Sequence, residues 1–191
     1  MPSPLSAAPR RQRRDAVRND AAIVSAARAV FAEQGPQASM ESIAARAGLG
    51  VGTIYRRFPS KGALLDAIAQ LFVEEMDRAA ADALANADVA RGLEGFLEFA
   101  GAFNVEKLRY AAALTDRVAS EEASRRTAES VAELTRRAVE AGVLAADVTS
   151  EDITALIVAM RAVIAAAPGQ EQSAWRRFVR IHLDGLRAKR H

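Results

Sequence analysis

The feature that most constrains the fold is the segment from Ser39 to Lys61, which reads SMESIAARAGLGVGTIYRRFPSK. It predicts two short helices joined by a glycine turn. Ser39 is a favoured residue at a helix start, because its hydroxyl accepts a hydrogen bond from a backbone N–H that the helix leaves unpaired. Ile43 and Ala47 then share one face, and Gly48 supplies the turn. This helix-turn-helix arrangement is typical of proteins that bind DNA.

The second short helix is predicted over about Val51–Phe58. Ile54 and Phe58 are expected to face inward and hold it in place. The remaining polar side chains carry hydroxyl or guanidinium groups, which suit DNA phosphates and base edges: Thr53, Tyr55, Arg56 and Arg57. For Tyr55 the alternative is a place in the core, and for the two arginines it is simple solvation.

The charged residues are distributed unevenly along the chain. The total of 26 Lys and Arg against 24 Asp and Glu includes ten basic and four acidic residues within the first 61 positions. The remainder therefore holds 16 basic and 20 acidic residues. This asymmetry indicates an N-terminal part that faces a polyanion and a C-terminal part that does not. The arginines of Arg10–Arg14 are expected to reach a neighbouring DNA groove or to form a solvated tail.

Composition and the positions of helix-capping and helix-breaking residues predict an all-α fold. The chain has 191 residues, enough for at most two modest domains, and half of them are hydrophobic. Few stretches alternate with a period of two, so no sheet is expected. The first helix is predicted to start at a cap formed by Asn19 or Asp20, and a fourth helix to run from Lys61 to about Ala85. Further helices are predicted over residues 93–103 and 114–141, and on either side of Pro168–Gly169.

Several classes of protein are excluded by what the sequence lacks. It contains no cysteine, hence no disulfide and no thiolate metal site, which suits the cytoplasm. It shows no secretory segment and no run of about 18 apolar residues that could span a membrane. The histidines, His182 and His191, have no glutamate three residues before them, and no nucleotide-binding or zinc-protease motif occurs. We therefore expect no metal, no cofactor, no membrane contact and no enzymatic activity.

Three stretches, AARAVFAEQG, IAARAG and GTIYRRFPSK, fall within about Asn19–Leu65. Together they closely resemble the DNA-binding domain of TetR-family transcriptional regulators, whereas the rest of the chain is similar only in its all-helical plan. Gly50 stands where the family commonly has serine, and Val51 where a polar residue is frequent. The resemblance implies a flexible basic arm (residues 1–18), a helix-turn-helix domain (19–65), and a helical effector-binding and dimerisation domain (66–191).

The resemblance also implies roles on a double-stranded DNA operator. Tyr55 and Lys61 are expected to contact the phosphate backbone. Val51 suits a thymine methyl group, Arg56 can fork onto a guanine, and Gly52 lets the backbone approach the bases. The complete predicted DNA-binding set is Ser39, Val51, Gly52, Thr53, Tyr55, Arg56, Arg57 and Lys61.

A site for a small-molecule effector is implied in the C-terminal domain. The residues expected to line it are Phe96, Phe99, Phe103, Tyr110, Leu114 and Met160. Such a lining favours a largely apolar or aromatic molecule, and an ordinary core is the alternative. In the usual mechanism of the family, the effector tilts the fourth helix and releases DNA, so DNA must weaken effector binding by the same factor.

The last two predicted helices each carry an apolar stripe at helical spacing. The resemblance and the two-fold symmetry of operator reading both favour a homodimer in which these helices form half of a four-helix bundle. The predicted interface contains Ile157, Met160, Ile164, Trp175, Phe178, His182, Leu183 and Leu186. Packing within one chain is the alternative and uses part of each stripe.

Together these features predict a homodimeric TetR-like transcriptional regulator, a repressor released from a palindromic operator by its ligand. A helical DNA-binding or architectural protein without an effector pocket is the second hypothesis. A partner-binding helical module that no longer binds DNA is disfavoured by the presence of Thr53, Tyr55 and Lys61.

Overall fold

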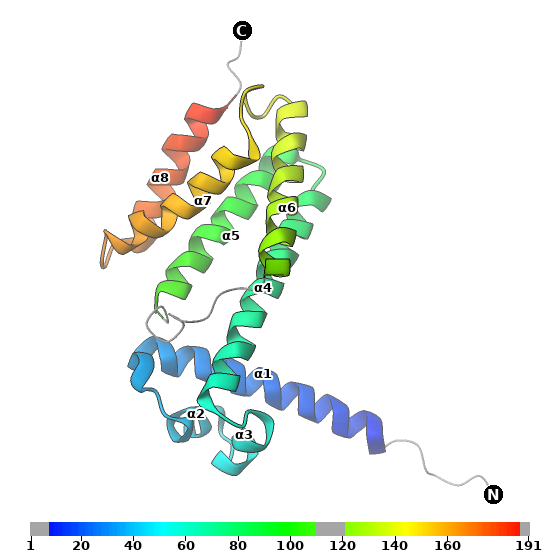
Figure 1. Cartoon of the computed structure of the whole chain (residues 1–191), viewed down its shortest axis with the longest axis vertical. Helices are drawn as coiled ribbons and strands as arrows, with labels where there is room; N and C mark the ends of the chain where they lie inside the picture. The colour runs from blue at the N-terminus through cyan, green and yellow to red at the C-terminus, as the bar shows by residue number, and fades with distance from the viewer. Residues whose placement is uncertain (1–7, 110–120, 188–191) are drawn as a thin grey trace, which may run out of the picture. The chain divides into compact units, whose positions relative to one another are not determined.

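A computed structural model describes residues 8–109 and 121–187 of the chain. Within these residues the chain forms eight α-helices and one short 3-10 helix (Figure 1). In chain order they are α1 (Ala8–Gln34), η1 (Gly35–Gln37), α2 (Met40–Ala47), α3 (Val51–Arg57), α4 (Lys61–Ala85), α5 (Val89–Arg109), α6 (Glu121–Glu140), α7 (Ser150–Ala165) and α8 (Glu171–Leu186). The predicted all-α class is confirmed. None of the described helices has the length and apolar character that crossing a membrane requires.

The chain divides into two compact units, Met1–Ala69 with Arg109–Thr115 and Gln70–Leu108 with Asp116–His191. The division falls inside α4, so this helix contributes its first turns to the first unit and the rest to the second. The sequence-based boundary between residues 65 and 66 lies close to this division.

The first unit is built around apolar side chains from α1, α2, α3 and α4. Those with no exposed surface include Ile23, Ala27, Phe31, Ile43, Ile54 and Leu64. Helices as short as α2 and α3 are marginal on their own in water. Burying one large aliphatic side chain contributes about 1.5–3 kcal/mol. Ile43 and Ile54 therefore hold the two short helices in the core of the first unit.

The start of α1 differs from the prediction. The helix begins at Ala8, so the predicted cap at Asn19 or Asp20 is wrong, and residues 8–18, expected as a loose arm, are helical. Arginine and alanine make up most of these residues, and both are strong helix formers. Asp20 has a different partner, because its carboxylate accepts hydrogen bonds from Arg57 of α3.

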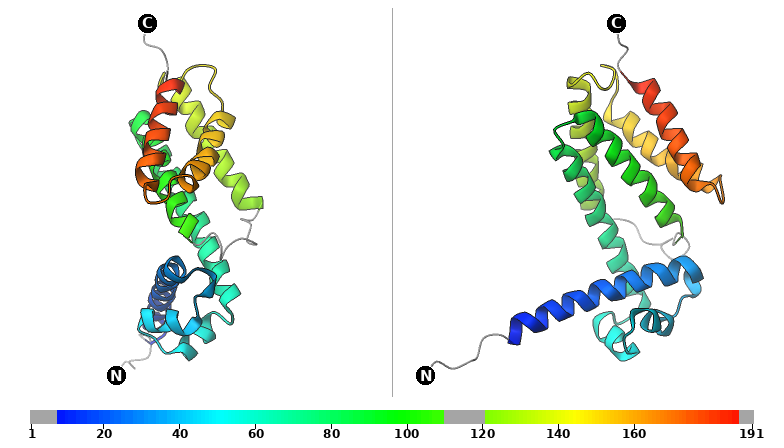
Figure 2. Two further views of the ribbon diagram at one scale, coloured as in Figure 1. Left: turned by 90° about the vertical axis from the view of Figure 1, so that its left-hand side faces the viewer. Right: turned by 180° about the vertical axis from the view of Figure 1, so that it is seen from behind.

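In the second unit, α5, α7 and α8 lie side by side (Figures 1 and 2). Their shared core includes Phe96 and Leu97 of α5, Met160 of α7 and Trp175 of α8, all 2% exposed or less. A capping box starts α7: the Asp152 carboxylate accepts from the Thr149 N–H at 2.9 Å, and the Thr149 hydroxyl accepts from the Asp152 N–H at 3.4 Å. The cap predicted for this helix is thus confirmed.

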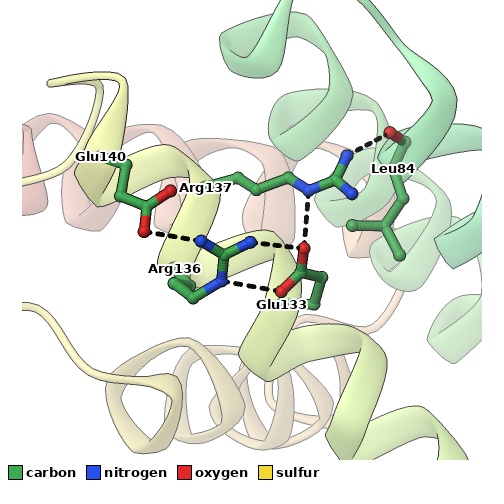
Figure 3. A network of polar contacts seen from close by, with 5 residues as sticks. All are labelled: Leu84, Glu133, Arg136, Arg137 and Glu140. Carbon is green, nitrogen blue, oxygen red and sulfur yellow. Dashed lines mark hydrogen bonds and ion pairs between the residues drawn. The ribbon is translucent and has the colours of Figure 1, made fainter.

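A group of charged side chains on α6 includes an arginine that is hydrogen-bonded to the end of α4 (Figure 3). Arg137 donates to the Leu84 carbonyl at 2.8 Å and to Glu133 at 2.7 Å. Glu133 also accepts from Arg136, which donates in turn to Glu140. Hydrogen bonds from Arg136 and Arg137 lower the pKa of Glu133 from 4.5 to about 2. Arg137 therefore satisfies a carbonyl that the last turn of α4 leaves unpaired.

Candidate nucleic-acid interface

The helix-turn-helix predicted from the sequence is present as α2, a turn and α3. The Ser39 hydroxyl accepts from the Ser42 N–H at 3.1 Å and so caps α2. Gly48 ends the helix with φ +67, a left-handed conformation that residues with a Cβ rarely adopt. The Leu49 N–H then donates to the Ala44 carbonyl at 3.1 Å. Both ends of α2 are therefore fixed by residues that the sequence singles out.

A buried isoleucine and a half-buried phenylalanine orient α3. Ile54 has no exposed surface, and Phe58, at the C-terminal end, donates its N–H to the Ile54 carbonyl at 2.7 Å. Gly50 precedes the first residue of the helix and provides no side-chain cap. Because Ile54 points into the core, the opposite side of α3 faces solvent.

The solvent-facing side of α3 carries four of the predicted DNA-binding residues: Val51, Gly52, Tyr55 and Arg56, hereafter the reading face. Val51 is 38% and Tyr55 44% exposed, unusually high for such side chains. Val51 and Tyr55 are four residues apart, as are Gly52 and Arg56, so the four form two adjacent rows on the helix. Thr53 is half-buried.

Gly52 does not serve the protein's own packing. A Cβ built at this position meets nothing within 4 Å, and its φ is outside the left-handed region. Neither sterics nor backbone conformation therefore explains a glycine in the first turn of α3, since glycine inside a helix costs up to about 0.5–1 kcal/mol relative to alanine. A glycine that leaves open space on a reading face fits the close approach of another molecule.

The predicted cations at the edge of this face have partners within the first unit. Arg57 donates from Nε to Oδ1 of Asp20 at 2.6 Å and from Nη2 to Oδ2. The Lys61 ammonium donates to the Pro36 carbonyl and lies 5.7 Å from the centroid of the Phe31 ring. These partners could not be read from the sequence, because they are far from Arg57 and Lys61 along the chain.

Of the predicted effector residues, two form an aromatic stack and two are buried in the core of the second unit. Phe99 and Phe103 stack with their centroids 5.9 Å apart, and Phe103 also makes an edge contact with Phe72 of α4 at 5.1 Å. Phe96 and Met160 are buried in the core, 2% and 0% exposed. The other two predicted residues, Tyr110 and Leu114, lie outside the described residues.

Sequence reasoning missed Lys107, which lies in α5 one turn after Phe103. The lysine is half-buried, and burial, assisted by the neighbouring charge of Arg161, lowers its pKa. Asn104, on the preceding turn, is only 9% exposed. A lysine in a sequence is usually solvated, so only the packing distinguishes this one.

The predicted dimer stripe divides into buried and exposed residues. Met160, Ile164, Trp175 and Leu183 are at most 6% exposed within one chain. These four belong to the core of the second unit, so within one chain they expose little surface, and their part in a dimer interface stays a prediction. The exposed or half-buried remainder is Ile157, Phe178, His182 and Leu186.

A groove lies between α7 and α8, and three of these four residues, Phe178, His182 and Leu186, line it. Its volume is about 490 Å³, and it is lined by Asp152, Ala155, Leu156, Ala159, Phe178, Ile181, His182, Gly185 and Leu186. The His182 ring packs on Phe178 at 3.9 Å between centroids, and its Nδ1 lies 2.8 Å from the Phe178 carbonyl. Ile181, beside it, is 49% exposed. Within the described residues, no group of acidic, histidine or cysteine side chains could hold a metal ion.

Comparisons with known proteins cover both units. The model for bacterial regulatory proteins of the tetR family matches residues 23–68, and the model for the C-terminal domain of SbtR-like transcriptional regulators matches residues 61–188. No curated protein gives a significant match.

Solved structures of similar proteins match over almost their whole length. A TetR transcription regulatory protein from Mycobacterium vanbaalenii is 31% identical, with 93% of this chain and 99% of that chain covered and a TM-score of 0.75. A TetR transcriptional regulator from Streptomyces coelicolor is 28% identical, with coverages of 90% and 99% and a TM-score of 0.75. A TetR-family regulator from Pectobacterium atrosepticum is 27% identical, with coverages of 94% and 99% and a TM-score of 0.61.

Proposed function

The chain belongs to the TetR family of DNA-binding transcriptional regulators, and we propose that it is a homodimeric repressor that a small apolar or aromatic ligand releases from a palindromic operator. Members of this family are regulators rather than enzymes. The observation that carries the proposal is the reading face, an exposed set of apolar, hydroxyl and guanidinium groups on the second helix of a helix-turn-helix.

On the operator, α3 enters the major groove. Arg56 forks onto a guanine and Val51 touches a thymine methyl group, while Gly52 allows the helix backbone to approach the base edges. The Tyr55 hydroxyl and the Lys61 ammonium bind phosphates. The exposure of Val51 and Tyr55 supports this assignment, since a helix that had no partner would gain by hiding such side chains.

The groove between α7 and α8 is proposed to receive the same two helices of a second copy. One observation and one symmetry argument support a copy of this chain as the occupant. The groove has a largely apolar lining that includes Ile181, which is 49% exposed, and Val158 of α7 is also 58% exposed. A two-fold operator also requires two reading faces related by the same symmetry.

The effector site is proposed to lie beside the stacked rings of Phe99 and Phe103 in the second unit. An aromatic or apolar body would pack on these rings. Asn104 and the half-buried Lys107 would supply the few polar contacts that orient it. Because the coupling is reciprocal, operator DNA must weaken binding of the ligand by the same factor by which the ligand weakens binding of DNA.

The experiment that tests the proposal is selection of bound sequences from a random duplex library with the full chain at near-physiological salt. Enrichment of one inverted repeat, with half-sites about one helical turn apart or somewhat more, is the expected result. Salt-sensitive binding without an enriched motif would instead support an architectural DNA-binding protein, the second hypothesis. No binding at all would contradict both.

A further inference from the structure

Two neighbouring arginines at the end of α3 have different surroundings. Arg56, on the reading face, makes no hydrogen bond or ion pair within the described part of the chain. Arg57 is turned toward α1, where its Nε and Nη2 donate to the two carboxylate oxygens of Asp20. The Nε distance is 2.6 Å. Planar pairing of this kind is the geometry in which a guanidinium also binds a phosphate.

The partner of Arg57 therefore occupies the guanidinium edge that a DNA phosphate would use. The side chains of Arg57 and Asp20 are 48% and 26% exposed, so the pair lies at the surface, where DNA could compete for it. The Asp20 carboxylate also neutralises the charge of Arg57 next to the reading face. Sequence-independent DNA affinity comes almost entirely from cations that neutralise phosphates. The loss of one such cation therefore lowers the affinity and its salt dependence by a measurable amount.

We propose that Asp20 limits the affinity of this protein for DNA of any sequence by holding the guanidinium of Arg57 away from the phosphate backbone. Asp20 is thus a positioning residue that acts through Arg57. This inference rests on the proposed function, because it requires α3 to lie against DNA. It also refines the expected role of Arg57, which becomes a phosphate ligand only when Asp20 releases it.

The test measures binding of the full chain to a fixed non-operator duplex over a range of salt concentrations. Asp20→Asn keeps the shape of the side chain and removes its charge. The expected result is a slope of log K against log salt that is more negative by about 0.9, with binding about five- to tenfold tighter near 0.1 M salt. Adding Arg57→Ala to this variant should abolish the gain, and Arg57→Ala alone should leave the wild-type slope unchanged.

A matched control comes from α1, the helix that also contains Asp20. Glu33 of α1 pairs with Arg46 of α2 at 2.5 Å, with both side chains about half exposed. Glu33→Gln changes the net charge of the first unit as Asp20→Asn does, but leaves Arg57 in place. The difference between the two variants therefore isolates Arg57 from a general electrostatic effect. Thermal unfolding of each variant verifies that it is folded.

Three outcomes would overturn the inference. Asp20→Asn could behave like Glu33→Gln, or Arg57→Ala alone could reduce the slope by about 0.9, which would mean that Arg57 already binds a phosphate. Asp20→Asn could also weaken DNA binding without altering the slope, which would make the pair a structural tie between α1 and α3. Failure of the proposed function looks different: wild-type protein would then select no operator motif from the duplex library, or would show no salt-dependent DNA binding at all.

Discussion

Gly101 of α5 lies directly against the indole of Trp175 of α8, so that a Cβ built on the glycine would be 2.3 Å from Cε3 of the ring. No real Cβ makes such a contact, and Trp175 has no exposed surface through which to move away. The close approach of α5 and α8 in the second unit therefore depends on the absence of a side chain at position 101.

The first prediction follows from this contact. Gly101→Ala should destabilise the protein by about 1–3 kcal/mol, because overpacking outweighs the gain in helix propensity. Gly95→Ala is the matched control: this glycine is on the same helix, and a Cβ there meets nothing within 4 Å. The control should gain about 0.5–1 kcal/mol. Chemical denaturation of both variants measures the difference, and equal behaviour would contradict the contact.

At Gly52 an added Cβ is expected to affect DNA binding rather than stability, in contrast to Gly101. Gly52→Ala should leave stability unchanged or raise it by about 0.5–1 kcal/mol, since the new methyl group enters open space. Operator affinity should nevertheless fall, because the methyl group keeps α3 from approaching the bases. Denaturation and operator titration separate the two effects, and Gly95→Ala again serves as the control, with unchanged DNA binding. A variant that binds the operator as wild type does would remove Gly52 from the interface.

Arg56 is expected to discriminate one base pair in each half-site. Arg56→Lys keeps the positive charge but loses the planar fork, so discrimination at that pair should drop by about 1–3 kcal/mol. Affinity for non-operator DNA and its salt dependence should stay the same. Selection profiles of wild type and variant provide the comparison. Identical profiles would show that Arg56 takes no part in base reading.

The groove between α7 and α8 leads to a prediction about assembly. Ile181→Glu should give monomers with poor operator affinity, because a charge would be buried in the proposed interface. Leu108→Glu is a suitable control, since Leu108 is 41% exposed in the same unit and does not line the groove. Sedimentation of both variants decides the question. A persistent Ile181→Glu dimer would place the interface elsewhere.

Glu133 should make stability depend on pH in the acid range. Hydrogen bonds from Arg136 and Arg137 lower its pKa from 4.5 to about 2, so the folded state favours the ionised carboxylate. The stabilisation is therefore complete above pH 4.5 and is lost as the pH falls toward 2. Thermal unfolding between these limits should show that the Tm difference between wild type and Glu133→Gln shrinks with falling pH. A constant difference would mean that this carboxylate does not carry the effect.

The local structure of the helix-turn-helix could be predicted because its signals are local. Ser39 caps α2 and Gly48 ends it, as expected, since caps and left-handed turns depend on one residue and its immediate neighbours. The inward position of Ile54 followed from helical periodicity in the same way. The start of α1 was missed because a residue that can cap a helix, Asp20, has its carboxylate bound by Arg57 instead.

The all-helical class, the family and the inward side of α3 could be predicted from the sequence alone, because periodicity, caps and motif spacing depend on nearby residues. Which residues of the two C-terminal stripes are buried depended instead on the packing of whole helices: Trp175 and Leu183 are buried, whereas His182, next to Leu183, is exposed. The same holds for the partner of Arg57, Asp20, which lies 37 residues away along the chain. Such contacts depend on how helices pack, and packing brings together residues whose separation in sequence carries no signal.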